Sequence, residues 1–326
     1  MAGATGSAGS GQPSPAAEQT QGLRLAILAT LFFSTSAVLV RLASGLGPLE
    51  VASYRLILGA GFVAVIAAAG RQRSRSLLRE PVLAGEAAGV RPSPARRFLP
   101  ILAAGLVAAL HFAFYIGALY RTTIAHALVL VNLSPLLAMP LAAVFLGERF
   151  DLRRLPGVLV VIAGLAIMVG LEPGLTRAQL SGDLMALLAA LAYAVYSLIG
   201  RGQRTRTNLL AYTFWVYLVA GLALLPLAQW QRVMGRVSAA GTALPGLTIL
   251  AVVLLALLPT AGGHTLYNAA LRRADAVTVN LIATQEVTGG VLLGLLLLGE
   301  VPSAQAIAGG IVALGGLGLV LARRQA

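Results

Sequence analysis

The amino-acid sequence predicts an all-α integral membrane protein with ten transmembrane helices arranged as two inverted five-helix repeats. Three observations predict this fold: a charge-poor composition, ten apolar stretches of membrane-spanning length, and similarity between the two halves. Of the 326 residues, 58% are hydrophobic and only 11% are charged, whereas roughly a quarter of the residues in soluble domains are charged. The composition therefore excludes both an ordinary soluble domain and a disordered chain.

The apolar stretches define the helices, because a helix needs about 20 apolar residues to cross the hydrocarbon core. In chain order the predicted spans are 23–43, 50–70, 98–119, 124–147, 155–172, 182–200, 208–228, 246–270, 276–299 and 303–322. Very short turns between several of them indicate paired hairpins in one bundle. Residues 1–21 are small and polar without the apolar core of a signal peptide, so we expect a disordered tail there.

The arginines predict the orientation. All 24 basic residues are arginine, and 18 of them fall on cytoplasmic segments if the N-terminus is cytoplasmic. This bias follows the positive-inside rule and predicts a multi-pass protein of the inner membrane with both termini in the cytoplasm, 323–326 being the C-terminal tail. Orientation also explains the net charge of +13 without a nucleic-acid partner. The chain contains no cysteine, which excludes disulfides, thiolate metal sites and a cysteine nucleophile.

An internal repeat relates residues 22–172 to residues 173–322. The matched positions, first at an offset of 160 and then of 152, are Arg41 with Arg201, Tyr115 with Tyr267, Arg121 with Arg273, and Gly147-Glu148 with Gly299-Glu300. Because each unit has five helices, the second copy must enter the membrane from the opposite side. Such inverted repeats support alternating access, with the binding site near the midplane between the halves.

Several short motifs carry a family resemblance. They are Leu146-Gly147-Glu148, Leu298-Gly299-Glu300, Tyr54-Arg55 and Gly182-Asp183-Leu184, together with the glycine-rich last helix of each half. In these features the sequence resembles the drug/metabolite transporter (DMT) superfamily, in its EamA-type branch. The resemblance implies a ten-helix inner-membrane carrier of small organic molecules, often an exporter.

Polar residues within the predicted spans are candidates for a substrate cavity. They are His111, Tyr115, Tyr193, Tyr196, Ser197, Thr260, His264, Tyr267, Asn268, Asn280 and Thr284. Thr260, His264 and Tyr267 follow at i, i+4 and i+7, on one helical face. Pro135 and Pro259 predict helix breaks, which membrane proteins tolerate where the backbone lines a cavity or is buried in protein. For the single histidines and tyrosines, satisfied contacts between helices remain the alternative.

Glu286 is the one carboxylate near the middle of a predicted span. A charge there costs about 2.5–3.5 kcal/mol on insertion scales, so we expect the residue to carry a proton and to couple transport to protons. The alternative is a structural, protonated carboxyl, because Gly290 and Gly294 on the same face form a helix-packing surface. Arg55 either binds a carboxylate or extends to the membrane interface.

The sequence thus predicts a secondary active transporter that moves a small organic metabolite, such as an amino acid, nucleoside or drug-like compound, with export favoured. The alternative is a non-transporting membrane sensor or assembly partner. An enzyme is not expected, because cysteine, His-Glu-x-x-His and Gly-x-Ser-x-Gly are all missing. We expect no cofactor, metal or nucleotide, since a Walker loop is also missing. Gly309-xxx-Ala313 allows close helix contact within one chain or in a homodimer.

Overall fold

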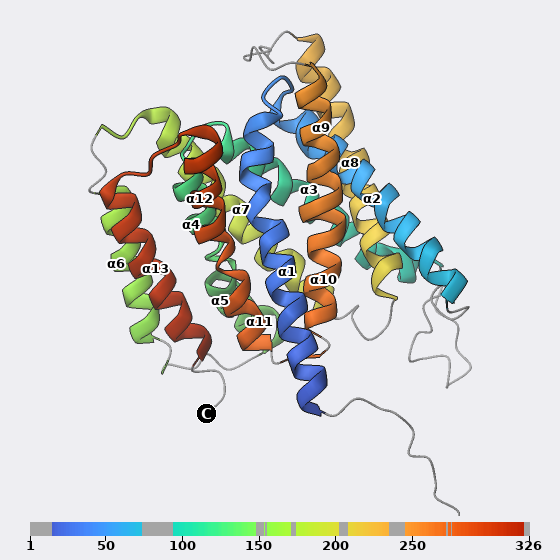
Figure 1. The fold of residues 1–326 in the computed structure, drawn as a ribbon, viewed down its shortest axis with the longest axis horizontal. Helices are drawn as coiled ribbons and strands as arrows, with labels where there is room; N and C mark the ends of the chain where they lie inside the picture. The colour runs from blue at the N-terminus through green and yellow to red at the C-terminus, as the bar shows by residue number, and fades with distance from the viewer. Residues whose placement is uncertain are drawn as a thin grey trace, which may run out of the picture.

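Helices form the regular elements of the computed structural model (Figure 1), and none of the residues it describes lies in a strand. The described residues are 15–73, 94–147, 153, 155–170, 174–201, 208–234, 245–271, 273–274 and 276–322. The helices are α1 (Pro15–Leu42), α2 (Pro48–Arg73), α3 (Pro94–Leu119), α4 (Ile124–Val131), α5 (Ser134–Leu146), α6 (Leu155–Gly170), α7 (Arg177–Arg201), α8 (Leu209–Val233), α9 (Pro245–Leu255), the π-helical segment η3 (Ala256–Gly263), α10 (His264–Ala270), α11 (Ala276–Ala283), α12 (Glu286–Leu298) and α13 (Ala304–Ala322).

Eight helical runs are long and apolar enough to cross a membrane. Two further apolar helices, Leu155–Val169 and Ala304–Val320, coincide with the fifth and tenth predicted spans but are shorter. With 16 residues, α6 is about 24 Å long at 1.5 Å per residue, less than the roughly 30 Å of a hydrocarbon core. The chain is therefore a multi-pass membrane protein, with eight full-length spans and two short apolar helices in its described part.

The first helix begins earlier than predicted. We expected a tail up to residue 21, but α1 is helical from Pro15. A proline is favoured at the first helical position, and Glu18 complements the positive end of the helix dipole in the first turn. The remaining predicted tail segments, 1–14 and 323–326, lie outside the described residues.

Figure 1 shows α6 and α13 as a pair at one edge of the bundle, α2 and α8 at the other edge, and α1 between them. The face where α1 begins and α13 ends, at the bottom of this view, is called the terminal face below, and the opposite face is the far face. The helix α1 packs against α9, η3, α10, α11 and α12, whereas α3 packs against α7 and α8. The helix α1, which belongs to the first half, therefore packs chiefly against helices of the second half.

Glycines allow α6 and α13 to approach closely. A Cβ atom on Gly309 would lie 2.5 Å from the Gly164 carbonyl oxygen, and one on Gly316 would lie 2.9 Å from the Gly157 carbonyl oxygen. The Ala313 backbone would likewise block a side chain at Gly164. The stripe formed by Gly309 and Ala313 is therefore occupied within this chain by α6.

Two helical runs are interrupted near their middles. The helices α4 and α5 are separated at Asn132 and Leu133, and α11 and α12 are separated at Thr284 and Gln285. The bounds of α11 and α12 fall 152 residues after those of α4 and α5. Both runs end on a glycine with φ of 66°, Gly147 and Gly299, a left-handed conformation that glycine adopts without steric cost. Glu148, which follows the first of these, lies outside the described residues.

Candidate functional site

A cavity lies beside these two interruptions. Its space, counting the part open to solvent, is about 860 Å³. The lining residues are Phe33, Ser36, Arg55, His111, Phe112, Tyr115, Val131, Asn132, Ser134, Pro135, Tyr193, Pro259, His264, Tyr267, Asn280, Ala283, Thr284 and Glu286. The walls therefore come from both halves of the chain.

The π-helical segment shapes one wall, and Pro259 explains its geometry. In an α-helix the Leu255 carbonyl would accept a hydrogen bond from the backbone N–H of residue 259, which proline lacks. The Thr260 hydroxyl takes that place and donates to the Leu255 carbonyl oxygen at 2.7 Å. The same hydroxyl oxygen is then free to accept hydrogen bonds from another helix.

That other helix is α2, which contributes Arg55. The Arg55 Nε and Nη2 atoms donate to the Thr260 hydroxyl oxygen at 3.0 and 2.9 Å, and Nη1 lies 3.5 Å from the Ser36 hydroxyl oxygen. The guanidinium carbon sits 4.7 Å from the centre of the Phe112 ring, a cation–π distance. Arg55 is only 2% exposed, so the interpretation that it extends to the membrane interface is wrong.

Glu286 begins α12 and lines the same cavity. Among the described residues its carboxyl group makes no hydrogen bond or ion pair. One and two turns further along α12, Gly290 contacts Leu128 and Gly294 contacts Ile124 of α4. The packing surface predicted for this face is thus present, and its first residue opens onto the cavity.

Aromatic rings cover much of the wall. The Phe33 ring centre lies 4.9 Å from that of His264 and 6.1 Å from that of Tyr267. On the other side, the His111 ring stacks on Tyr115 at 6.0 Å and tilts against Tyr193 at 5.0 Å. Apolar and polarizable surface therefore surrounds the charged groups, an environment suited to an amphipathic organic molecule.

Hydrogen bonds hold several of the predicted cavity residues in place. The Tyr267 hydroxyl donates to the Asn280 side-chain oxygen at 2.6 Å. The His111 Nδ1 atom of the first half lies 2.9 Å from the Ala189 carbonyl oxygen. These contacts fix the orientation of cavity side chains from α3, α10 and α11, with α7 supplying a backbone carbonyl.

The structure does not bring every predicted residue to this cavity. His111, Tyr115, Tyr193, His264, Tyr267, Asn280, Thr284, Glu286, Pro135 and Pro259 line it, whereas Tyr196, Ser197, Thr260 and Asn268 do not. Thr260 is fully buried and holds Arg55. The Asn268 amide donates to the His264 carbonyl oxygen of its own helix at 2.7 Å, and Tyr196 contacts the Tyr193 ring.

Sequence reasoning gave Arg55 a binding role only as one of two alternatives, and it did not select Ser36, Phe112 or Ser134 as cavity residues. Ser134 carried a signal, because it stands 152 residues before Glu286 and so at the equivalent position of the repeat. Arg55 also carried one, since apolar residues flank it on both sides along the chain.

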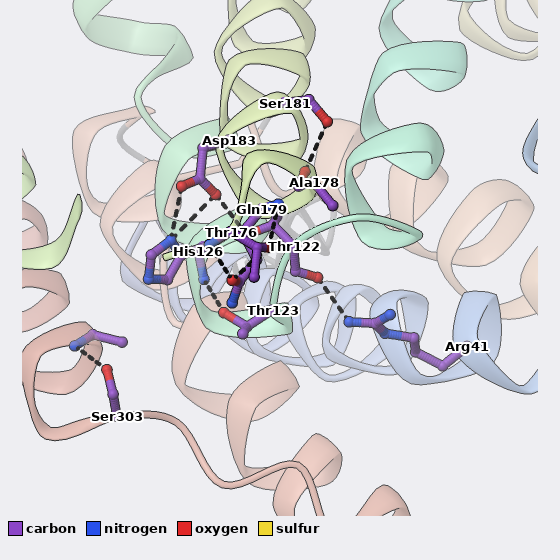
Figure 2. A network of polar contacts seen from close by, with 11 residues as sticks. Arg41, Thr122, Thr123, His126, Thr176, Ala178, Gln179, Ser181, Asp183 and Ser303 are labelled. Atoms are coloured by element: carbon purple, nitrogen blue, oxygen red, sulfur yellow. Dashed lines mark hydrogen bonds and ion pairs between the residues drawn. The ribbon is translucent and has the colours of Figure 1, made fainter. Parts of the chain in front are cut away.

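A partly buried polar network links helix ends at the far face (Figure 2). The Thr122 hydroxyl donates to one Asp183 carboxylate oxygen at 2.6 Å, and the His126 Nδ1 atom lies 3.1 Å from the other. Figure 2 also shows Arg41, whose Nη2 atom donates to the Thr122 carbonyl oxygen at 2.8 Å. These contacts tie the end of α1, the turn between α3 and α4, and the first turns of α7 together.

Glu300, just after α12, adds two further contacts to this network. Its carboxylate accepts a hydrogen bond from the Ile124 backbone N–H at 2.5 Å and lies 3.3 Å from Arg41 Nη2. Nearby, Tyr120 donates to the Leu46 carbonyl oxygen at 2.8 Å. Burial, with a smaller contribution from the Glu50 carboxylate, raises the pKa of the Tyr120 hydroxyl to about 12, so it remains a donor at neutral pH.

A metal centre is not formed, since no group of three or more histidine, cysteine, aspartate or glutamate residues in the described ranges could hold an ion. The site therefore offers a mixed aromatic and polar cavity with one arginine and one glutamate.

Comparison with known proteins gives consistent matches. The model of the EamA-like transporter family matches residues 20–170 and again residues 180–322. "Pseudopaline exporter CntI" of Pseudomonas aeruginosa is 26% identical over 292 residues, which cover 89% of this chain and 92% of that one. The "Probable terminal-alkyne amino-acid exporter" of Streptantibioticus cattleyicolor is 30% identical over 196 residues, covering 59% and 62%. A solved crystal structure, 23% identical, superposes with a TM-score of 0.59 over 94% of this chain and 99% of its own, and shows the fold alone.

Proposed function

The chain belongs to the EamA-like transporter family, and from that premise we propose that it is a secondary active transporter of a small organic metabolite. The observation that carries the proposal is the cavity between the two halves, which holds both Arg55 and Glu286 inside the helical bundle. Charged groups at this depth are costly and mark substrate or ion pathways in membrane proteins. The relatives named as exporters support export as the direction.

We further propose that the two halves are inverted five-helix repeats. A Cβ on Gly182 would lie 2.8 Å from both the Cβ and the backbone nitrogen of Thr122. A Cβ on Gly22 would lie 2.7 and 2.9 Å from the same two atoms of Ala274. The two glycines are 160 residues apart and their partners are 152 apart, so one close contact occurs twice. Such a repetition is expected when a pseudo-two-fold axis relates the halves.

The repeats support alternating access, and the contacts support a state that is open toward the terminal face. On the far side α4 packs against α12, whereas α5 packs chiefly against α7 and α11 chiefly against α1. The cavity extends to Tyr267 and Asn280, which are partly exposed and lie within about one turn of the terminal-face ends of α10 and α11. With both termini in the cytoplasm of a cell with an inner membrane, this state would receive substrate from the cytoplasm.

Glu286 is proposed to couple transport to protons. Burial in a largely apolar cavity favours the neutral form of a carboxyl group, whereas a nearby polar or cationic group favours the charged form. Other groups facing this cavity, His111, His264, Tyr115 and Arg55, can influence its protonation. A change of exposure between the two faces would then let Glu286 take up a proton on one side and release it on the other.

Efflux from proteoliposomes tests this function. Vesicles holding the purified chain would be loaded with amino acids, nucleosides and small drugs, and mass spectrometry would report which compounds leave. We expect selective loss that a pH gradient changes, relative to vesicles without protein. A folded protein that releases none of the pool would instead favour the second candidate, a membrane sensor or assembly partner that keeps the transporter fold.

A further inference from the structure

We propose that Arg55 and Tyr115 form a carboxylate-binding subsite, so that the transported metabolite carries a single carboxylate group. The inference deepens the proposed function, because it assigns a substrate class to the same cavity. It rests on two independent observations: a buried guanidinium without an anion, and a buried hydroxyl without a hydrogen-bond partner.

The Arg55 guanidinium is incompletely satisfied. It offers five N–H donors, of which two meet the Thr260 hydroxyl and one faces the Ser36 hydroxyl at a long 3.5 Å. No carboxylate of the described chain lies within ion-pair distance of it. A buried charge is costly unless it is paired and hydrogen-bonded. Hydroxyl partners and the Phe112 ring stabilise the cation in part, and an anion would complete the pairing.

The Tyr115 hydroxyl supplies the second donor. Its side chain is only 5% exposed and lines the cavity, and although the Ser36 side chain lies close to the hydroxyl, no described residue forms a hydrogen bond of ordinary geometry with it. Tyr115 stands three residues after Phe112, the ring under Arg55, and so on the same face of α3. An acceptor group bound at Arg55 would therefore lie on the side of α3 that presents this hydroxyl.

The chemistry of the cavity favours a carboxylate over a phosphate. Among the described residues Arg55 is the one arginine that lines the cavity, so a monoanion balances its charge, whereas a phosphate dianion would add an unbalanced negative charge beside Glu286. A planar guanidinium matches a carboxylate with two parallel hydrogen bonds. The rings of Phe33, Tyr193 and His264 then contact the apolar remainder of the molecule.

Matched acid and amide probes test the subsite on the purified full chain in nanodiscs. Equilibrium dialysis would compare phenylacetate and N-acetylphenylalanine with their amides, which have nearly the same shape but no charge. We expect both acids to bind at least about tenfold more tightly than their amides, the ratio given by one lost charge-assisted hydrogen bond. Equal binding of acid and amide, or no binding of either acid, would overturn the proposal.

Three variants locate the effect. Tyr115→Phe removes only the hydroxyl and should weaken acid binding about tenfold and amide binding by less, because the hydrogen bond to a neutral amide oxygen is weaker than the bond to a carboxylate. Arg55→Gln should remove the preference for acids. The control is Tyr217→Phe. The Tyr217 hydroxyl donates to the carbonyl oxygen of Thr260 at 3.3 Å, and Thr260 is the residue that holds Arg55, but Tyr217 is not among the residues that line the cavity. If Tyr115→Phe binds the acids as tightly as the unmodified chain, the hydroxyl is not part of the subsite.

The outcomes also separate this inference from the proposed function. Selective efflux of compounds that lack a carboxylate, unaffected by Tyr115→Phe, would uphold transport and overturn the subsite. Binding of acids that depends on Arg55 and Tyr115, in a chain that releases nothing from vesicles, would uphold the subsite and contradict transport.

Discussion

Replacing Glu300 with alanine should open the far face of the protein. The substitution removes the hydrogen bond from the Ile124 N–H to a carboxylate at 2.5 Å and the contact with Arg41 at 3.3 Å. A hydrogen bond to a charged group contributes about 1.5–3 kcal/mol, and a partly exposed ion pair about 0.2–1 kcal/mol. If both contacts exist only in the closed state, their loss raises the ratio of open to closed molecules about 20- to 900-fold.

Cysteine labelling measures this ratio, because the chain has no cysteine of its own. A cysteine replacing Leu119, which is fully buried at the far end of α3, would be exposed to an impermeant maleimide from the far side. Labelling should be faster by a similar factor in the Glu300→Ala background. Arg232→Ala is the control, because its ion pair with Glu50 at 3.3 Å joins α2 and α8 on the same face, and these helices pack against each other. Equal labelling rates in the otherwise unmodified protein, in Glu300→Ala and in Arg232→Ala would show that the Glu300 contacts do not hold the far face closed.

Three further predictions address coupling, the cavity and packing. Glu286→Gln should abolish the effect of a pH gradient on efflux, and continued concentration of substrate against its gradient would contradict a coupling role. Tyr267→Ala should weaken substrate binding in a dialysis assay more than Tyr217→Ala, because only Tyr267 lines the cavity; equal losses would contradict the assignment. Gly309→Val should destabilise the protein by about 1–3 kcal/mol through overpacking, seen as a lower melting temperature, whereas Gly315→Ala meets no atom within 4 Å and should melt no lower.

The sequence predicted those features that depend on residues close together along the chain, namely the helical runs and the face of a helix on which a side chain lies. Apolar length located the helical runs, and the spacing of His264 and Tyr267 after Pro259 placed both on the face that lines the cavity. The start of α1 was predicted too late, because a polar helical extension before the apolar run has no hydrophobic signal. The fifth span was predicted over 155–172, and α6 covers Leu155–Gly170 of it, the last two predicted residues lying outside the described ranges.

Contacts between distant segments could not be predicted in the same way. The pairing of His126 with Asp183 joins two helices, and nothing in their spacing along the chain indicates it. The sequence of Gly309 and Ala313 predicted a close helix contact without showing that α6 is the partner. For Arg55 the sequence left a carboxylate site and the membrane interface both open, because helix position does not reveal the Thr260 hydroxyl that holds the side chain in the cavity.

Substrate protection of a cavity cysteine tests most directly whether this cavity is the transport site. Thr284 lines the cavity, whereas Asn268, on α10, does not. A cysteine at either position would be alkylated from the terminal face, with and without the compound that leaves proteoliposomes. If this cavity is the transport site, the compound slows alkylation at position 284 and leaves the rate at position 268 unchanged. Efflux that continues while neither rate changes would contradict this assignment.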